Sequence, residues 1–227
     1  MRICLFGQGP LCEAVEAALE AQGHTLLGPY ATPQPTELLK GTQASVGLSC
    51  GYRHKLKPEE WACFPDGILN LHTGYLPWNK GAYPNVWPIL DSSPAGVTLH
   101  RVDEGWDTGP ILAQVKIEVE PIDTAYTLYE KLLAEGVKMV AAVVRETEAQ
   151  NATGGGGWPR GFPQDFRAGS FHRKADLAEW GNNFERYYGA IDAMRRLRAL
   201  SFPGYGLRYR QDGKLIEATI TLKEVIE

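Results

Sequence analysis

Short apolar segments alternate with amphipathic segments over residues 2–72, and this alternation restricts the fold more than any other feature. Arg2–Phe6 has the character of a buried strand, a Gly-rich turn follows it, and Leu11–Ala21 has the spacing of an amphipathic helix. The same order continues with strand Thr25–Leu27, helix Glu37–Lys40, strand Ala44–Ser49, a short helix after Pro58, and strand Gly67–His72. Strands that alternate with helices pair in parallel and are covered by those helices. The sequence therefore predicts an α/β fold, with a mostly parallel sheet and helices on both faces.

From Gly96 onward the regular alternation of strands and helices ends, and the chain follows a different order of elements. Two segments rich in β-branched residues, Gly96–Val102 and Pro110–Val119, precede a long helix from Thr124, its expected N-cap, to Thr147. Four consecutive glycines, 154–157, have too little side chain to pack, so we expect a main domain at 1–150 and a C-terminal extension at 151–227. The extension should contain a helix, Asn183–Leu200, and a hairpin of Gly206–Arg210 with Lys214–Leu222, turned by Asp212-Gly213.

Composition excludes several classes of partner. The formal net charge of −4 and the pI of about 5.8 argue against a dedicated nucleic-acid surface. No apolar stretch approaches the roughly 20 residues that a membrane span needs. The four cysteines lack C-x-x-C spacing, which favours reduced thiols over disulfides or metal ligands. We therefore expect a cytoplasmic protein with no metal site and no nucleic-acid or membrane partner.

Several weaker motifs are better explained by structure than by chemistry. The turn Gly7-Gln8-Gly9-Pro10 lacks the third glycine of a dinucleotide fingerprint, which favours a tight βα turn that can still offer N–H groups to a phosphate. Cys50 follows a strand, but no clear base accompanies it, which favours a small buried side chain over a nucleophile. Four histidines are isolated in the sequence, and surface or core roles are expected for them: His24, His54, His100 and His172. Of these, His172 with its neighbours Arg173 and Lys174 could contact an anion.

Three polar residues with complementary chemistry stand out. Asn70 and His72 are two apart in a strand, so both side chains project from the same face. Asp107 lies in the Gly- and Asp-rich loop Val102–Gly109. An amide, an imidazole and a carboxylate that meet at a strand end suit acyl transfer to a nitrogen without a covalent enzyme intermediate. Whether His72 or Asp107 would accept the proton stays open at this point.

The motif order N-x-H…L-P…G…G-V-T-x-H…D-x-G-x-D-T-G, carried by Asn70–Gly81, Gly96–His100 and Asp103–Leu112, resembles the formyltetrahydrofolate-dependent formyltransferases. The segment Leu76–Gly81 and the tail Ile191–Leu222 are most similar to the branch that formylates nucleotide-linked amino sugars. The resemblance implies a Rossmann-like catalytic domain, a homodimer that pairs through its C-terminal hairpin, and formyl transfer from N10-formyltetrahydrofolate to a dTDP- or GDP-linked amino sugar of the kind found in lipopolysaccharide O-antigens.

The resemblance also implies site residues. It gives Asn70, His72 and Asp107 as the catalytic set, Cys50, Gly51, Tyr52, Leu69, Asp103 and Asp107 as the folate contacts, and Gln8, Trp78, Asn79, Lys80 and Tyr83 as the substrate contacts. Formylation of another small amine and hydrolysis of the cofactor remain alternatives. Initiator-tRNA formylation fits less well, because the tail is short for an added tRNA-binding domain. A nucleotide-sensing module would leave the polar cluster without a purpose.

Overall fold

The central sheet has six strands in the order β2-β1-β3-β4-β6-β7. The structure, a computed structural model, describes residues 1–177, 189–204, 206–211 and 213–224. The strands are β1 Arg2–Gly7, β2 Thr25–Tyr30, β3 Val46–Cys50, β4 Ile68–His72, β6 Ala95–Arg101 and β7 Ile111–Ile117. The strands β1 to β4 pair in parallel, whereas β6 pairs antiparallel with β4 and β7 pairs antiparallel with β6. The predicted mostly parallel α/β sheet is confirmed.

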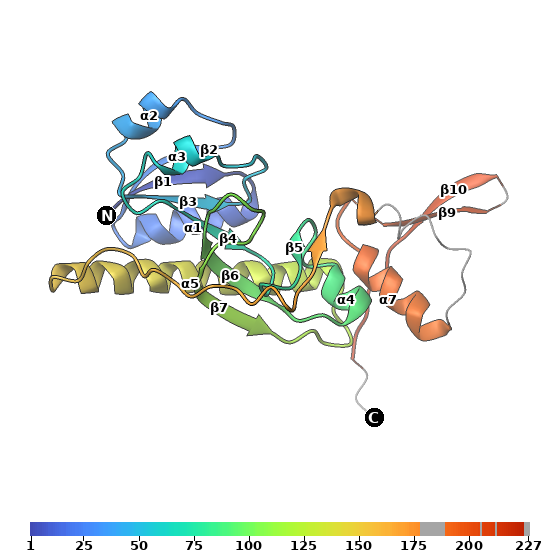
Figure 1. Cartoon of the computed structure of the whole chain (residues 1–227). Helices are drawn as coiled ribbons and strands as arrows, with labels where there is room; N and C mark the ends of the chain where they lie inside the picture. Colours follow the sequence, from blue (N-terminus) through green and yellow to red (C-terminus); the bar gives the residue numbers. More distant parts are fainter. Residues whose placement is uncertain (178–188, 205, 212, 225–227) are drawn as a thin grey trace.

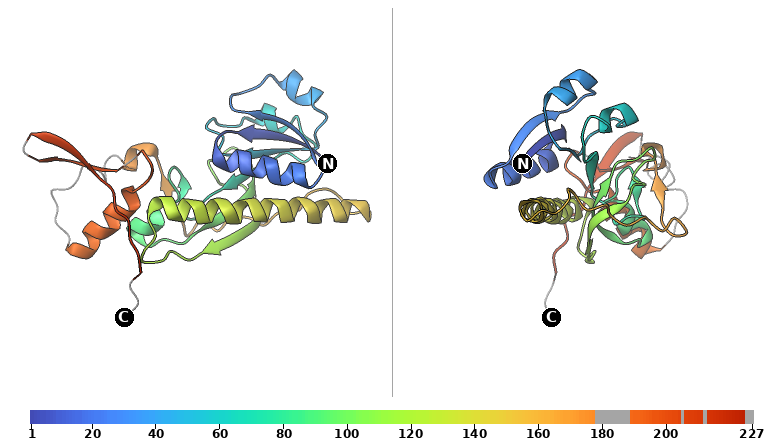
Figure 2. Two further views of the ribbon diagram at one scale, coloured as in Figure 1. Left: turned by 180° about the vertical axis from the view of Figure 1, so that it is seen from behind. Right: turned by 60° about the vertical axis from the view of Figure 1, so that its left-hand side comes forward.

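Helices cover both faces of this sheet, as expected (Figures 1 and 2). The helices α1 (Pro10–Ala21) and α5 (Ala125–Ala152) pack on one face, and the short helices α2 (Thr36–Gly41) and α3 (Pro58–Trp61) lie on the other. Alternation along β1 explains the two layers, because Ile3 packs in the core with α1 and α5 while Cys4 packs with α2. Each face of the sheet therefore has its own hydrophobic core.

Helix α5 supports the strand that carries Asn70 and His72. Thr124 caps this helix by accepting from the backbone N–H of Thr127 at 3.2 Å, as predicted. The helix continues five residues beyond the predicted end, to Ala152, and the chain leaves it through Gly154, which has a φ of 88°. Gly136 faces β4 so closely that an added Cβ would lie 3.3 Å from Leu71, so a residue without a side chain allows tight helix–strand contact there.

After α5 the chain runs back along the body of the protein, in what we call the return segment, residues 158–174 (Figure 1). The guanidinium of Arg101 donates to the carbonyl of Pro159 at 2.8 Å, and Phe162 exchanges two backbone hydrogen bonds with Ile111. Farther on, β8 (Phe171–His172) pairs in parallel with β5 (Lys80–Gly81). The Gly-rich stretch therefore leads into a segment that packs on the sheet body, whereas the predicted domain boundary at 150 stays a prediction.

The C-terminal part contains a helix and a hairpin, as expected. Helix α7 (Ala190–Leu200) lies next to α4 (Trp87–Asp91), and β9 (Leu207–Gln211) pairs antiparallel with β10 (Lys214–Ala218). The second hairpin strand ends at Ala218, four residues before the predicted end. Residues 183–188 of the predicted helix and residue 212 of the predicted turn lie outside the described residues. Within the described part of the chain, no helix has the length and apolar character to cross a membrane.

Candidate active site

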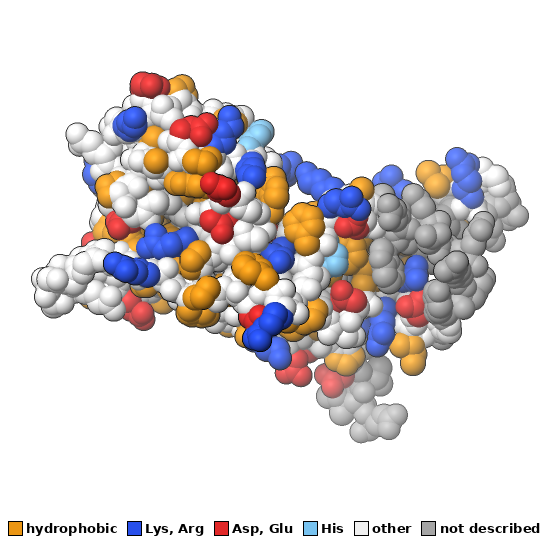
Figure 3. Space-filling model, viewed as in Figure 1, with side chains coloured by type: hydrophobic (Ala, Val, Ile, Leu, Met, Phe, Trp, Pro, Cys, Tyr) orange, Lys and Arg blue, Asp and Glu red, His pale blue; other side chains and the backbone are white. Residues whose placement is uncertain are grey.

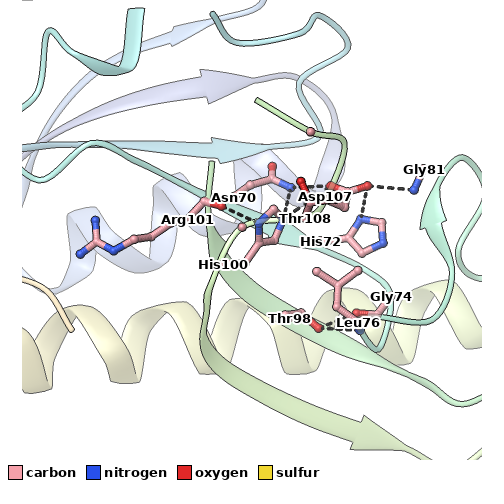
Figure 4. A network of polar contacts seen from close by, with 12 residues as sticks. Asn70, His72, Gly74, Leu76, Gly81, Thr98, His100, Arg101, Asp107 and Thr108 are labelled. Atoms are coloured by element: carbon pink, nitrogen blue, oxygen red, sulfur yellow. Dashed lines mark hydrogen bonds and ion pairs between the residues drawn. The ribbon is translucent and has the colours of Figure 1, made fainter. Parts of the chain in front are cut away.

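Asn70 and His72 project from the end of β4, which lies between β3 and β6 in the sheet. The residue opposite Asn70 on β6 is His100, so this histidine faces the same polar cluster. Asp107 enters from the loop that connects β6 and β7 (Figure 4). The structure thus brings the three predicted catalytic residues together and adds His100 to them.

The hydrogen bonds of His72 define its orientation. Its Nε2 lies 2.8 Å from the carbonyl oxygen of Asn79, which can only accept, so Nε2 carries a hydrogen. Its Nδ1 points at Asp107 and lies 3.6 Å from Oδ2 (Figure 4). Gly74 makes this arrangement possible, because a Cβ there would lie 2.5 Å from Nε2 of His72. The buried imidazole therefore offers its second nitrogen to the carboxylate.

Asp107 is held in a left-handed backbone conformation, with a φ of 55°. Asp and Asn tolerate this region better than most residues because their short side chains bond locally. Its Oδ2 accepts the backbone N–H of Gly81 at 2.8 Å. Burial alone raises the pKa of the Asp107 carboxyl, but its interactions with the imidazoles of His72 and His100 and with the N–H of Gly81 together hold this pKa well below its usual range. The site therefore contains a fixed negative charge.

His100 is a member of the cluster that sequence reasoning left aside as an isolated histidine. Its Nδ1 lies 2.8 Å from the carbonyl oxygen of Arg101 and so carries a hydrogen. Its Nε2 lies 3.1 Å from Nδ2 of Asn70 and 3.5 Å from Oδ1 of Asp107. In the neutral ring this nitrogen accepts one N–H of Asn70, which orients the amide. The available signal was that His100 ends the Gly96–His100 part of the family motif; its place beside Asn70 follows from the antiparallel pairing of β4 with β6.

These residues line a cavity of about 720 Å³. Its wall is formed by the segment after β3, the segment after β5, the β6–β7 loop and the end of the return segment: residues 49, 51–56, 70–73, 81–84, 100, 102, 103, 105–107, 171, 173 and 174, with Leu11. In the space-filling view, Lys and Arg side chains gather beside the notch between the sheet body and the C-terminal part (Figure 3). The cavity thus combines the polar cluster with aromatic and cationic rims.

The sequence profile of the family described as Formyl transferase matches residues 30–144, half of this chain. The chain belongs to the formyl transferase family. The matched residues include β3, β4, β6, β7 and most of α5, and with them the whole Asn70, His72 and Asp107 cluster.

Three relatives of this formyl transferase family member are informative. The methionyl-tRNA formyltransferase of Solibacter usitatus is 31% identical over 63% of this chain and 47% of its own length. The dTDP-4-amino-4,6-dideoxyglucose formyltransferase of Mycobacterium bovis is 38% identical over 32% of each chain. The chain thus spans less than half the length of either curated relative. A crystal structure of the formyltransferase PseJ from Anoxybacillus kamchatkensis, in complex with UDP-4,6-dideoxy-4-formamido-L-AltNAc and tetrahydrofolate, is 30% identical, has a TM-score of 0.66, and covers 85% of this chain and 94% of its own.

Among the residues expected to contact folate, four line the cavity and two do not. Gly51, Tyr52, Asp103 and Asp107 belong to its wall, whereas the side chains of Cys50 and Leu69 are buried in the core. Burial raises the pKa of the Cys50 thiol well above its usual value, which removes it as a nucleophile. Asp103 also orders its loop, since one oxygen accepts from Thr108 Oγ1 at 2.6 Å and from the backbone N–H of Gly105 at 3.0 Å.

Among the residues expected to contact the substrate, only Tyr83 lines the cavity. The side chain of Asn79 is fully buried and donates to Ser93 and to the carbonyl of Pro94, so it builds the loop rather than the wall. The ammonium group of Lys80 lies 5.1 Å above the ring of Phe166. Trp78 and the exposed Gln8 are also outside the wall. Substrate contact by these residues stays a prediction.

Sequence reasoning placed the return segment outside the main domain, yet Phe171, Arg173 and Lys174 form part of the cavity wall. The available signal was the cationic run after His172, whose ring stacks on Trp87 at 3.9 Å. Arg173 is already engaged by Asp176, whose Oδ1 it contacts at 2.9 Å. Across the described ranges, no group of three or more His, Cys, Asp or Glu residues is arranged to hold a metal ion.

Proposed function

We propose that this formyl transferase family member transfers a formyl group from N10-formyltetrahydrofolate to the amine of a nucleotide-linked amino sugar. The observation that carries the proposal is the convergence of Asn70, His72 and the ionised Asp107 on one cavity wall. The relative solved with a nucleotide-linked formamido sugar and tetrahydrofolate supports the substrate class, because nearly all of that protein aligns with this chain.

The polar cluster suits direct attack of the amine on the formyl carbon. A carbon–nitrogen bond forms, and the carbonyl π electrons move onto the formyl oxygen, which becomes negative. Asn70 has one N–H on His100 and a second whose 3.4 Å contact with Asp107 is long, so the second is available for this oxygen. Preorganised donors of this kind are often the largest catalytic contribution.

Proton transfer falls to the His72–Asp107 pair. The attacking nitrogen becomes positive, and the space between Nδ1 of His72 and Oδ2 of Asp107 is where its proton is received. In this pair His72 receives the proton on Nδ1, and the carboxylate of Asp107 stabilises the imidazolium that forms. The proton then passes to N10 of the folate, the bond from the formyl carbon to N10 breaks, and tetrahydrofolate leaves with the electrons of that bond.

The cavity wall suggests where each substrate lies. We assign the folate to the side of Gly51, Tyr52 and the 103–107 loop, as the family resemblance implies. The nucleotide sugar then occupies the side formed by residues 81–84, 171, 173 and 174. This side offers the aromatic rings of Tyr83 and Phe171 for stacking, and the cations of the return segment for the diphosphate.

The similarity to a methionyl-tRNA formyltransferase makes tRNA the second candidate acceptor. The net charge of −4 argues against it, since binding to a nucleic-acid backbone depends on clustered cations. Another small amine, or water in a cofactor hydrolase, would use the same polar cluster. The acceptor therefore has to be identified by experiment.

The test is to incubate the full chain with N10-formyltetrahydrofolate and single acceptors: dTDP-, UDP- and GDP-linked amino sugars, free amino acids, methionyl-tRNA, or none. We expect one class of nucleotide sugar to gain the mass of a formyl group while tetrahydrofolate appears in equal amount. Formylation of tRNA alone, or formate release without an acceptor, would refute the proposed substrate. His72→Ala should abolish transfer with folding intact, and normal turnover in that variant would remove the proposed mechanism.

A further inference from the structure

The separation of His72 and Asp107 is not fixed by the two residues themselves. Their 3.6 Å contact between Nδ1 and Oδ2 is too long for a good hydrogen bond. His72 is instead anchored through its other nitrogen by the carbonyl of Asn79, and the Asp107 oxygen that faces His72 is held by the N–H of Gly81. What holds Asn79 and the Asp107 turn in place therefore determines the geometry of the pair.

Gln164 of the return segment holds the Asp107 turn. Its Nε2 donates to the carbonyl oxygen of Asp107 at 2.9 Å and to that of Gly109 at 2.8 Å, so both amide hydrogens bind this one turn. The residue is 7% exposed, and its Oε1 has no hydrogen-bond partner among the residues that the structure describes. An unpaired buried acceptor is unfavourable, and Asp107 has a left-handed backbone that the turn does not favour by itself. The two hydrogen bonds from Gln164 therefore hold Asp107 in this conformation.

Ser170 of the same segment holds Asn79. Its Oγ accepts the backbone N–H of Asn79 at 2.9 Å and lies 3.3 Å from Oδ1 of that residue. Asn79 also has a left-handed backbone, with a φ of 58°. The neighbouring ladder is regular, because the N–H of Lys80 donates to the carbonyl of Ser170 at 3.1 Å. Ser170 thus fixes the peptide whose carbonyl orients His72.

We propose that Gln164 and Ser170 are positioning residues of the formyl transfer site, which hold Asp107 and His72 at the separation that the reaction requires. Neither residue lines the cavity, so each acts through the residue that it binds. The role in catalysis rests on the proposed function, whereas the structural clamp does not. Displacements of about 1 Å in a catalytic arrangement can cost roughly a hundredfold in rate.

The first test is kinetic. Gln164→Met keeps the length of the side chain and removes both donors, and Ser170→Ala removes the hydroxyl. We expect kcat to fall roughly ten- to a hundredfold in each variant, with little change in KM for either substrate. Ser170→Thr should restore most of kcat, because it keeps the hydroxyl. The matched control is Gln22→Met, which removes an amide donor to the carbonyl of Ala141 away from the cavity and should keep the wild-type kcat.

The second test needs no activity. Carboxyl ¹³C NMR, with Asp107 assigned from Asp107→Asn, follows ionisation of this group in the folded protein. We expect the Asp107 carboxyl to stay ionised well below pH 4 in wild type and Gln22→Met, and to take up its proton at a higher pH in Gln164→Met, where its turn is released from its place beside His72 and Gly81.

The outcomes are separable. Unchanged kcat in both Gln164→Met and Ser170→Ala, or an unchanged Asp107 titration in Gln164→Met, would overturn the proposal. If wild type formylates no acceptor, the proposed function fails, and the titration alone then decides whether Gln164 positions Asp107. If Gln164→Met does not fold, Ser170→Ala with its Ser170→Thr rescue decides the proposal.

Discussion

Replacement of Asp107 by asparagine removes the negative charge of the site and keeps an oxygen for the N–H of Gly81. In the proposed reaction the amine proton reaches His72, whose Nδ1 is then a cation 3.6 Å from the carboxylate. The side chains of His72 and Asp107 are only 8% and 13% exposed, and at an effective dielectric constant of about 20 this attraction amounts to roughly 4.6 kcal/mol. Since about 1.4 kcal/mol corresponds to a factor of ten, Asp107→Asn should lower kcat by about 10³-fold.

The assay is the steady-state rate of formyl transfer, with KM measured for the folate and for the acceptor. Both KM values should change little, because the charge acts on the transition state rather than on binding. The matched control is Asp123→Asn, which also removes a buried carboxylate, paired with Lys131 at 2.9 Å, but lies outside the cavity wall. A kcat for Asp107→Asn within tenfold of wild type would show that the carboxylate does not stabilise the protonated pair.

Three further predictions concern stability and geometry. Because folding lowers the pKa of Asp107, the contribution of this carboxylate to the stability of the folded protein is complete above about pH 4. It declines at lower pH, where the unfolded chain binds the proton first. In urea titrations, the difference in unfolding free energy between wild type and Asp107→Asn should therefore be smaller at pH 3 than at pH 6. Gly74→Ala should lower kcat by about tenfold or more with the fold retained by circular dichroism, since its methyl group would displace His72; normal kcat would contradict this. Thr124→Ala should lower the free energy of unfolding by about 1 kcal/mol and leave kcat unchanged, and an unchanged Tm would mean that the cap contributes nothing.

Periodicity predicted the parallel half of the fold and the position of Asn70 and His72. Each buried strand from β1 to β4 has a run of apolar residues, and the side chains two apart at the end of β4 lie on one face, as the strand geometry requires. Asp107 was found because its loop combines glycine with acids in a motif that is long and ordered. Each of these signals lies within a single strand or loop, so the sequence of that segment is enough to reveal it.

Long-range contacts could not be predicted in the same way. His100 reaches the cluster only because β6 pairs antiparallel with β4, and nothing near His100 in the sequence specifies that register. Gln164 and Ser170 lie in a segment with little regular structure, so no periodicity marked them, and the glycines before them indicated a boundary. The bonds that the Asn79 side chain makes with Ser93 and Pro94 inside its loop could not be predicted either, and its expected contact with a substrate stays a prediction.

The contact between Gln164 and Asp107 spans 57 positions of the chain, and this distance has a consequence for biosynthesis. A nascent polypeptide that has emerged only as far as α5 already contains every strand of the central sheet, together with Asn70, His72 and Asp107. It still lacks Gln164 and Ser170, which are proposed to position Asp107 and His72. The chemical competence of this protein should therefore appear later on the ribosome than the strands of its central sheet.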